Sequence, residues 1–448
     1  MGDPVQPCFD RLATPPDLLD LHRGAAERWP YLLASCAGAR GLGRWSILLH
    51  GTDEQLILDA DGLRGPGRGK KFLDRLEDWS GPPVAGDWHP DFPFQGGWFI
   101  YLGYELAAEI EPKLDLPGAK DGLPVAVAAR CPAAVLVDHL EGDAWLVAES
   151  VSALERARAE LVSDRRPRRG WQQPELDLKP DEGRRFLQGV ERIKDWILDG
   201  DVFQVNLSRG WHGVSRRPLD PASCYRALSR ANPAPFAGLA RLPGGTVLSS
   251  SPERLVRVRG RSAEMRPIAG TRPRGRTGRH DESLSRELMA HPKERAEHIM
   301  LIDLGRNDLG RVCENGSVEV DELMVVESYA HVHHIVSNLR GHLRPSIHAA
   351  AVIAAVFPGG TITGCPKVRC MEIICELERQ GRGFYTGSMG YLGRNGAMDL
   401  NILIRSMVVN DRRLSFRTGA GIVADSDPRA ELAETESKAR GLLEALGA

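Results

Sequence analysis

The order of strand-like and helix-like segments most constrains the fold of this chain, because the two kinds do not alternate as regular βαβ units. A doubly wound parallel sheet requires that alternation, so we expect an α+β domain with layered sheets and helices. No G-x-G-x-x-G motif follows a predicted strand and no P-loop is present, so a nucleotide cofactor is not expected. Strands are predicted at Trp45–Leu49, Gly97–Leu102, Val202–Ser208, Thr246–Ser250, Asn401–Val409 and Leu414–Thr418. Helices are predicted at Ala153–Leu161, Glu294–Leu304, Ala349–Val356, Pro366–Leu377 and Arg429–Leu446.

The tryptophans and the glycine-rich motifs are unevenly distributed along the chain. All nine tryptophans lie at or before Trp211, whereas the glycine-rich and acid-rich motifs cluster after it. A chain of 448 residues has room for two ordinary domains or one large one. The polar, proline-broken segment Asp164–Gly170 is typical of a surface connection. We therefore predict an N-terminal region, residues 1–175, with a structural or regulatory role, and a catalytic region, residues 176–448.

Charge and cysteine usage argue against several classes of function. The formal net charge is −2 and the basic residues form no long run, so neither a nucleic-acid partner nor an anionic membrane surface is expected. No apolar stretch is long enough to span a bilayer and Met1–Asp10 lacks the pattern of a secretory signal, so we expect a cytoplasmic protein. The eight cysteines include no C-x-x-C pair, which argues against a structural zinc site.

Two pairs of glutamates are spaced three residues apart on predicted helices. Glu294 and Glu297 form one pair and Glu431 and Glu434 form the other, so both carboxylates of each pair lie on one helix face. Lys438 follows Glu434 by one helical turn. Four carboxylates suit Mg²⁺, which takes a few carboxylate oxygens and keeps waters that a substrate can displace. The alternative interpretation of each pair is a solvated helix face.

Glycine-rich segments and cationic side chains accompany these glutamates. Glycine permits positive φ and lets backbone N–H groups approach an anion closely. Arginine and lysine supply donors of the kind that bind carboxylates. The segments are Pro267–Gly275, Pro358–Lys367 and Thr418–Ile422, and the cations are Arg272, Arg274, Lys367, Arg405 and Lys438. The combination indicates a small polyanionic substrate that binds with Mg²⁺.

Seven sequence motifs occur along the chain in the following order: Val202–Ser208 (VFQVNLS), Ser251–Glu253 (SPE), Pro267–Gly275 (PIAGTRPRG), KERAEHIMLIDLGRNDLGRV from Lys293, Pro358–Lys367 (PGGTITGCPK), Tyr385–Tyr391 (YTGSMGY) and TGAGIVADSDP from Thr418. Together they resemble the motifs of the chorismate-binding enzyme family. The resemblance extends from about Asp181 to the C-terminus, and it implies chorismate as the substrate. It also implies a four-layer α/β/β/α sandwich in which two large antiparallel sheets lie between outer helices.

The resemblance implies roles for residues near the metal and the reacting atoms. It implies that Glu297 and Glu434 bind Mg²⁺, with Glu294 and Glu431 in support, and that the ion holds the ring carboxylate of chorismate. The implied catalytic residues are Glu253, which protonates the departing 4-hydroxyl group, His334, Thr271, and Lys438, which lies beside the metal. Without the resemblance, Glu253 would be interpreted as a turn or cap carboxylate and His334 as a structural histidine.

The remaining implied residues bind the substrate. Tyr385, Arg405 and the backbone of Gly419 to Gly421 resemble the groups that hold the enolpyruvyl carboxylate. The implied substrate-binding set is Gly270, Thr361, Tyr385, Arg405, Gly419, Ala420 and Gly421.

Gln204 distinguishes reactions with ammonia from reactions with water. Water-using members of the family, the isochorismate and salicylate synthases, carry a lysine base where this chain has Gln204. A neutral amide cannot activate water, whereas ammonia is already nucleophilic. No Cys-His-Glu amidotransferase block occurs in the sequence, so we expect a separate glutamine amidotransferase subunit to supply the ammonia.

Two aminating branches of the family remain open. Asn206, Thr363 and the phrase LIDLGRNDLGRVCENGSVEV resemble the aminodeoxychorismate synthase component I branch, which makes 4-amino-4-deoxychorismate for p-aminobenzoate and folate. Tyr31–Ser35 also lacks the form of the tryptophan feedback motif found in anthranilate synthases. Ala269 points the other way, since many aminodeoxychorismate synthases carry a lysine there that is proposed to add covalently to the ring. The balance favours 4-amination over the anthranilate branch.

A non-catalytic relative that only binds an amidotransferase is a third hypothesis. It is disfavoured because Glu253, Glu297 and Glu434 are all present.

Overall fold

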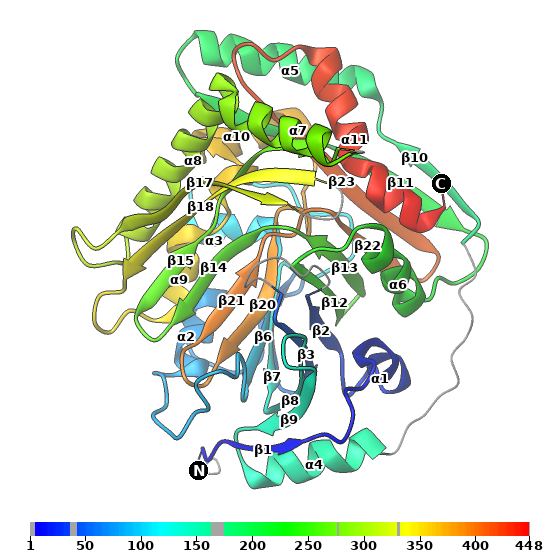
Figure 1. Cartoon of the computed structure of the whole chain (residues 1–448), viewed down its shortest axis with the longest axis vertical. Helices are drawn as coiled ribbons and strands as arrows, with labels where there is room; N and C mark the ends of the chain where they lie inside the picture. Colours follow the sequence, from blue (N-terminus) through cyan, green and yellow to red (C-terminus); the bar gives the residue numbers. More distant parts are fainter. Residues whose placement is uncertain (1–4, 36–42, 163–173, 276, 329–331, 448) are drawn as a thin grey trace.

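The computed structural model describes residues 5–35, 43–162, 174–275, 277–328 and 332–447. Its strands form two large antiparallel sheets with helices on their outer sides (Figure 1), which confirms the predicted four-layer α+β sandwich. The connection predicted at Asp164–Gly170 lies outside the described residues. Within the described ranges, none of the helices combines the length and the apolar character needed to cross a membrane.

The first sheet has 12 strands, and its register brings the glycine-rich C-terminal strand beside the VFQVNLS motif. In spatial order it contains β1 (Cys8–Arg11), β9 (Asp143–Ala148), β8 (Ala133–Asp138), β3 (Trp45–His50), β2 (Tyr31–Ala34), β12 (Phe236–Leu242), β13 (Gly245–Ser251), β22 (Ser406–Asn410), β23 (Arg413–Ile422), β11 (Gln204–Ser215) and β10 (Leu176–Pro180), with β19 (Gly364–Cys365) paired to β11.

The second sheet has 11 strands and holds most of the PIAGTRPRG motif on the strand next to the one that carries His334. In spatial order it contains β16 (Ile268–Pro273), β18 (Val332–His342), β15 (Ser262–Met265), β14 (Arg254–Arg259), β21 (Met398–Asn401), β20 (Ser388–Gly393), β6 (Gly97–Leu102), β7 (Ala126–Cys131), β4 (Gln55–Asp59) and β5 (Gly62–Arg64), with β17 (Glu319–Ser328) paired to β18.

The helices contact one sheet or the other. The first sheet contacts α1 (Leu18–Gly24), α4 (Val151–Val162), α5 (Gly183–Leu198), α6 (Pro221–Ala231), α10 (Lys367–Glu378) and α11 (Pro428–Leu446). α2 (Phe72–Ser80), α7 (Gly278–Ala290) and α8 (Pro292–Gly310) contact the second sheet, and α9 (Ala349–Val356) packs on α2 and α8. Shorter helical pieces are η1 (Tyr104–Leu106), α3 (Ala107–Ile110) and η2 (Gly360–Ile362).

A separate apolar core lies between the two sheets. Tyr31 of β2 stacks on Phe99 of β6 with their ring centroids 3.9 Å apart, and both side chains are about 1% exposed or less. Each sheet also contains strands from both parts of the chain, since β2 pairs with β12 and β6 pairs with β20. Residues 1–175 therefore help to hold the strands that carry the C-terminal motifs.

The predicted helices at Glu294–Leu304, Ala349–Val356, Pro366–Leu377 and Arg429–Leu446 are confirmed as α8 to α11. The prediction of one continuous strand over Asn401–Val409 is wrong. β21 ends at Asn401 and β22 begins at Ser406, because Arg405 has φ of 52°, which an extended strand cannot contain. The interruption falls at a residue predicted to bind substrate.

Candidate active site

The pairing of β11 with β23 places the VFQVNLS motif against the TGAGI segment. Asn206 lies opposite Gly421 and Ser208 lies opposite Gly419. Val205 and Leu207 pack into an apolar cluster with α5 and α10. Since side chains alternate along a strand, Gln204, Asn206 and Ser208 point to the other face. That face is where the candidate residues from the second sheet and from α8 and α11 converge.

The carboxylate of Glu297 on α8 lies beside Gln204. Gln204 Nε2 donates a 2.5 Å hydrogen bond to Glu297 Oε1. Burial raises the pKa of Glu297, the Gln204 bond and the charge of Lys438 lower it, and the negative charges of Glu294 and Glu434 raise it further, so the net shift is upward. Both neighbouring glutamates are candidate metal ligands. The site therefore concentrates negative charge that a divalent cation would offset.

Glu434 on α11 is held by a lysine. Lys438 Nζ lies 2.6 Å from Glu434 Oε1 and donates a 3.0 Å hydrogen bond to the carbonyl oxygen of Gly419. The ammonium group thus supplies the positive charge beside this carboxylate. In the described part of the chain, no three His, Cys, Asp or Glu side chains are grouped closely enough to hold a metal ion.

The two supporting glutamates each have a protein partner. Glu294 Oε1 lies 3.1 Å from Arg272 Nη1. Glu431 is buried, and Ser426 Oγ donates a 2.6 Å hydrogen bond to its Oε1. Glu294 therefore borders the PIAGTRPRG segment, while Glu431 fixes the segment that leads into α11.

Glu253 follows the end of β13 and is 5% exposed. Burial raises the pKa of Glu253 to about 7, against the opposing effects of a Thr361 hydrogen bond and the charge of Lys438. Thr361 Oγ1 donates that hydrogen bond to Glu253 Oε1 over 2.7 Å. A carboxyl with this pKa holds its proton at near-neutral pH and can act as an acid.

His334 on β18 is neutral in this environment. Burial lowers the pKa of His334 to about 4, and the ring is 7% exposed. Nδ1 lies 3.2 Å from the carbonyl oxygen of Gly270, so Nδ1 carries the proton in this contact and Nε2 carries the lone pair. The backbone of Thr271 pairs with that of His334 across β16 and β18, whereas the side chain of Thr271 lies outside the described part of the protein.

Any residue other than glycine at position 270 would have to displace neighbouring side chains. Its φ is 63°, in the left-handed region, and an added Cβ would lie 2.8 Å from Glu294 Oε2. The PIAGT segment therefore passes close to the carboxylate of Glu294, a candidate metal ligand.

Tyr385, Arg405 and the glycine strand form the predicted carboxylate-binding part of the site. A Cβ added to Gly419 would lie only 2.8 Å from the Tyr385 hydroxyl oxygen, so the glycine allows that hydroxyl group to approach the backbone of β23 closely. Desolvation lowers the pKa of Arg405, and the nearby Tyr385 and Glu434 oppose this. Arg405 Nη1 donates to the carbonyl oxygen of Lys438, which ties the arginine to α11.

Two of the cations proposed from sequence as anion-binding groups form ion pairs within the protein. Lys367 Nζ lies 2.8 Å from the buried carboxylate of Asp308, and Arg274 Nη2 lies 2.7 Å from Asp281 Oδ2. Anion binding by these two side chains stays a prediction. The Lys367 pair joins the start of α10 to α8.

A buried charged cluster behind the site was not found from the sequence. Glu378 pairs with Arg382 at 2.7 Å and with Arg417 at 2.8 Å, and the side chains of Glu378 and Arg382 are each 1% exposed. Burial raises the pKa of Glu378, but the two arginines and Ser208 together hold it below its usual range. A Glu–Arg pair at i,i+4 in the sequence is usually a solvated surface pair, so no sequence signal marks it as buried.

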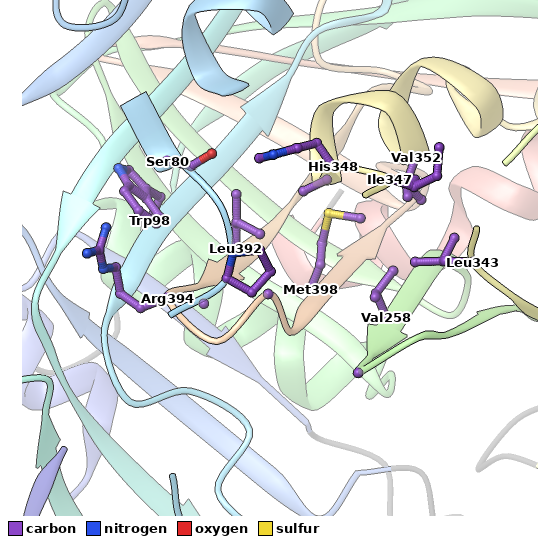
Figure 2. Close-up of a pocket in the computed structure, with 16 residues that line it drawn as sticks. Ser80, Trp98, Val258, Leu343, Ile347, His348, Val352, Leu392, Arg394 and Met398 are labelled. Carbon is purple, nitrogen blue, oxygen red and sulfur yellow. The ribbon is translucent and has the colours of Figure 1, made fainter. Parts of the chain in front are cut away.

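Two cavities lie elsewhere in the molecule. A small one of about 60 Å³, shown in Figure 2, is lined by Ser80, Trp98, His348 and Arg394 among others, and is too small for a substituted ring. A larger one of about 320 Å³ lies between strands of both parts of the chain, and its lining includes Ser35, Trp45, Phe236, Arg254 and Tyr391. The described residues that line these two cavities include none of the candidate metal ligands.

Comparison with known proteins places these residues in context. Residues 47–444 match the family described as chorismate binding enzyme. An anthranilate synthase component I-like protein from Synechocystis sp. is 45% identical over 79% of this chain and 73% of its own length. The aminodeoxychorismate synthase component 1 of Bacillus subtilis is 39% identical over 92% of this chain and 87% of its own length.

A solved structure of a related enzyme has the same fold. The crystal structure of anthranilate synthase component I from Streptococcus pneumoniae TIGR4 superposes with a TM-score of 0.79 at 31% sequence identity, covering 89% of this chain and 92% of that one. Because the family match spans nearly the whole chain and the sheets follow the same fold, this protein belongs to the chorismate-binding enzyme family.

Proposed function

We propose that this chain aminates chorismate at ring carbon 4 and produces 4-amino-4-deoxychorismate for p-aminobenzoate and folate synthesis. The observation that carries the choice of ammonia over water is the Gln204–Glu297 hydrogen bond. A neutral amide occupies the position beside the metal-site carboxylate where a base would be needed to activate water. We propose that a separate glutamine amidotransferase subunit delivers the ammonia and, on the sequence grounds given above, that the enzyme acts in the cytoplasm.

Mg²⁺ is the proposed cofactor. Glu297 and Glu434 would hold it, with Glu294 beside them, and the mutual repulsion of these carboxylates supports a cation there. When bound, the ion would supply positive charge that holds the ring carboxylate of chorismate and draws electrons from the ring.

The protein's own residues account for the proton transfer. Glu253, with its pKa near 7, gives its proton to the departing 4-hydroxyl group, which leaves as water while ammonia forms the new bond to carbon 4. Thr361 donates to Oε1 of Glu253, so the proton resides on the other oxygen of the same carboxyl. Lys438, held by Glu434 and the Gly419 carbonyl, keeps a positive charge next to the anionic substrate.

The second candidate function is 2-amination with loss of pyruvate, as in anthranilate synthase. Ala269 favours it, because the residue is small and apolar where a covalent lysine would be required. Ala269 is 6% exposed within β16. The 4-amination proposal therefore relies on direct attack by ammonia or on another nucleophile.

A product assay distinguishes the two functions. Purified protein is incubated with chorismate, Mg²⁺ and an ammonium salt at alkaline pH, with and without added aminodeoxychorismate lyase. p-Aminobenzoate that appears only with the lyase supports 4-amination. Fluorescent anthranilate formed without any lyase would overturn the proposal and assign the second function.

A further inference from the structure

Asn206 carries a buried hydrogen-bond acceptor that the protein leaves unused. The residue is 9% exposed on β11, and its Oδ1 atom has no hydrogen-bond partner among the residues that the structure describes. Buried polar atoms are almost always paired, so an unpaired one calls for a ligand or a functional role. Asn206 is adjacent to the proposed active site but has no role in the scheme above.

The unpaired atom lies beside the groups proposed to bind the enolpyruvyl carboxylate. A Cβ added to Gly419 would lie 2.9 Å from Asn206 Oδ1 and 2.8 Å from the Tyr385 hydroxyl oxygen. The two polar atoms therefore both lie close to the Cα atom of Gly419, and no side chain of residue 419 separates them. A ligand that contacts the Tyr385 hydroxyl group beside Gly419 would also lie near the carboxamide of Asn206.

The backbone of Asn206 is held from behind by Arg382. Arg382 Nη2 donates to the carbonyl oxygen of Asn206 at 2.7 Å. The other donors of the same guanidinium bond Glu378 at 2.7 and 3.1 Å, Ile362 O at 2.9 Å and Thr386 Oγ1 at 3.4 Å. All five N–H groups of the arginine are thus used, which fixes the main chain of Asn206 relative to the loops that carry Thr361 and Tyr385.

The carboxamide can present either of its two ends to a ligand. One end donates hydrogen bonds and the other accepts them. Turning the group over breaks no hydrogen bond of Oδ1, since that atom makes none. An anionic carboxylate next to Tyr385 would therefore face the NH₂ end. A valine of similar size offers no such contact.

We propose that Asn206 is a specificity-determining residue that holds the enolpyruvyl side chain of chorismate on the ring during amination. This inference rests on the proposed 4-amination. Loss of the side chain breaks the ether bond at ring carbon 3: enolpyruvate leaves with the bonding electron pair and takes up a proton, while the ring loses a proton and becomes aromatic. A hydrogen bond from Asn206 to the side chain restrains the movement that this departure requires.

The test measures pyruvate released per chorismate consumed, with ammonium as nitrogen source and no lyase present. Asn206→Val is expected to raise the KM for chorismate about tenfold, the effect of losing one hydrogen bond to a charged group, and to raise the pyruvate ratio several-fold. Asn206→Asp keeps the shape but presents only acceptors and a negative charge, so its KM is expected to rise further. Asn206→Ser serves as a smaller polar replacement should the first variant fail to fold.

Leu207→Val is the matched control, because Leu207 is the next residue of the same strand and packs on the opposite face. It is expected to lower the melting temperature without changing the pyruvate ratio. Unchanged KM and pyruvate ratio in folded Asn206 variants would overturn the inference. One pyruvate per chorismate in the wild-type protein, together with anthranilate, would instead overturn the proposed function, so the two failures are distinct.

Discussion

Thr361 of η2 donates a 2.7 Å hydrogen bond to the carboxyl group of Glu253, which lies 108 positions earlier between β13 and β14. Burial raises the pKa of Glu253 to about 7, and the Thr361 bond works against that rise. The hydroxyl group of Thr361 therefore sets how far the pKa of the proposed acid exceeds its ordinary value.

The rate of amination should fall above pH about 7 because the proposed acid must carry its proton. With free ammonia held constant across the pH range, kcat/KM is expected to decline about tenfold per pH unit on the alkaline side. Thr361→Val removes the hydrogen bond that lowers the pKa, so the decline should begin at higher pH. A profile that is identical in the variant and the wild type would contradict the role of Thr361.

Replacement of the acid should stabilise the protein while inactivating it. The pKa of Glu253 is raised from an ordinary 4.5 to about 7, so the folded state prefers the protonated form. The contribution of Glu253 to the free energy of unfolding is fully present below pH about 4.5. It is lost as the pH rises through about 7, which lowers the free energy of unfolding by about 3 kcal/mol. The side chain introduced by Glu253→Gln is neutral at every pH in this range, so the variant does not lose this free energy of unfolding.

Urea unfolding of the wild type and Glu253→Gln at pH 5 and pH 8 measures the difference. The variant is expected to exceed the wild type in free energy of unfolding at pH 8 but not at pH 5. Equal stabilities at both values would show that Glu253 has an ordinary pKa and would remove the basis for its role as an acid.

Local sequence patterns predicted the elements that carry the metal-site glutamates. The three-residue spacing of Glu294 and Glu297 was assigned to a helix, and α8 confirms it. The same spacing gave no means of predicting that Glu297 would meet Gln204, 93 residues earlier, because that contact depends on the packing of α8 against the sheets. Only the resemblance to the family indicated that residues from distant motifs form one site, because helical periodicity describes each segment separately.

Arg405 and Arg382 show why other parts of the site escaped prediction. The run Asn401–Val409 has the composition of a strand, yet Arg405 adopts φ of 52°, a conformation that local propensity disfavours and only tertiary contacts impose. Arg382 lies four residues after Glu378, a spacing that normally marks an exposed ion pair. Its burial follows from β11 and β23, which are distant in sequence.

Glu434 should be required for Mg²⁺ binding but not for folding. Its side chain is 47% exposed and forms an ion pair with Lys438, so Glu434→Ala removes little buried contact. We expect loss of Mg²⁺-dependent turnover and of Mg²⁺ binding in calorimetry, with an unchanged melting temperature. Glu436→Ala is the control, since Glu436 lies on the same helix with its side chain 58% exposed and reaches Arg209 instead. Normal turnover of Glu434→Ala would rule out the metal assignment.

Arg382 should be needed both for folding and for the position of the substrate-binding groups. A lysine keeps the positive charge but has three donors in place of five, so Arg382→Lys leaves buried acceptors among Glu378, Asn206 and Ile362 without partners. The cluster is almost fully enclosed, so we expect the free energy of unfolding to fall by about 3 kcal/mol or more.

The same variant should lose kcat/KM for chorismate at temperatures where it remains folded, because the main chain of Asn206 is no longer fixed. Arg379→Lys provides the control: it makes the same replacement three residues earlier, at an exposed position that follows α10. That control should match the wild type in both urea unfolding and turnover. An Arg382→Lys protein that unfolds at the wild-type urea concentration would show that the buried cluster tolerates lysine, and that Asn206 is positioned by β11 and β23 alone.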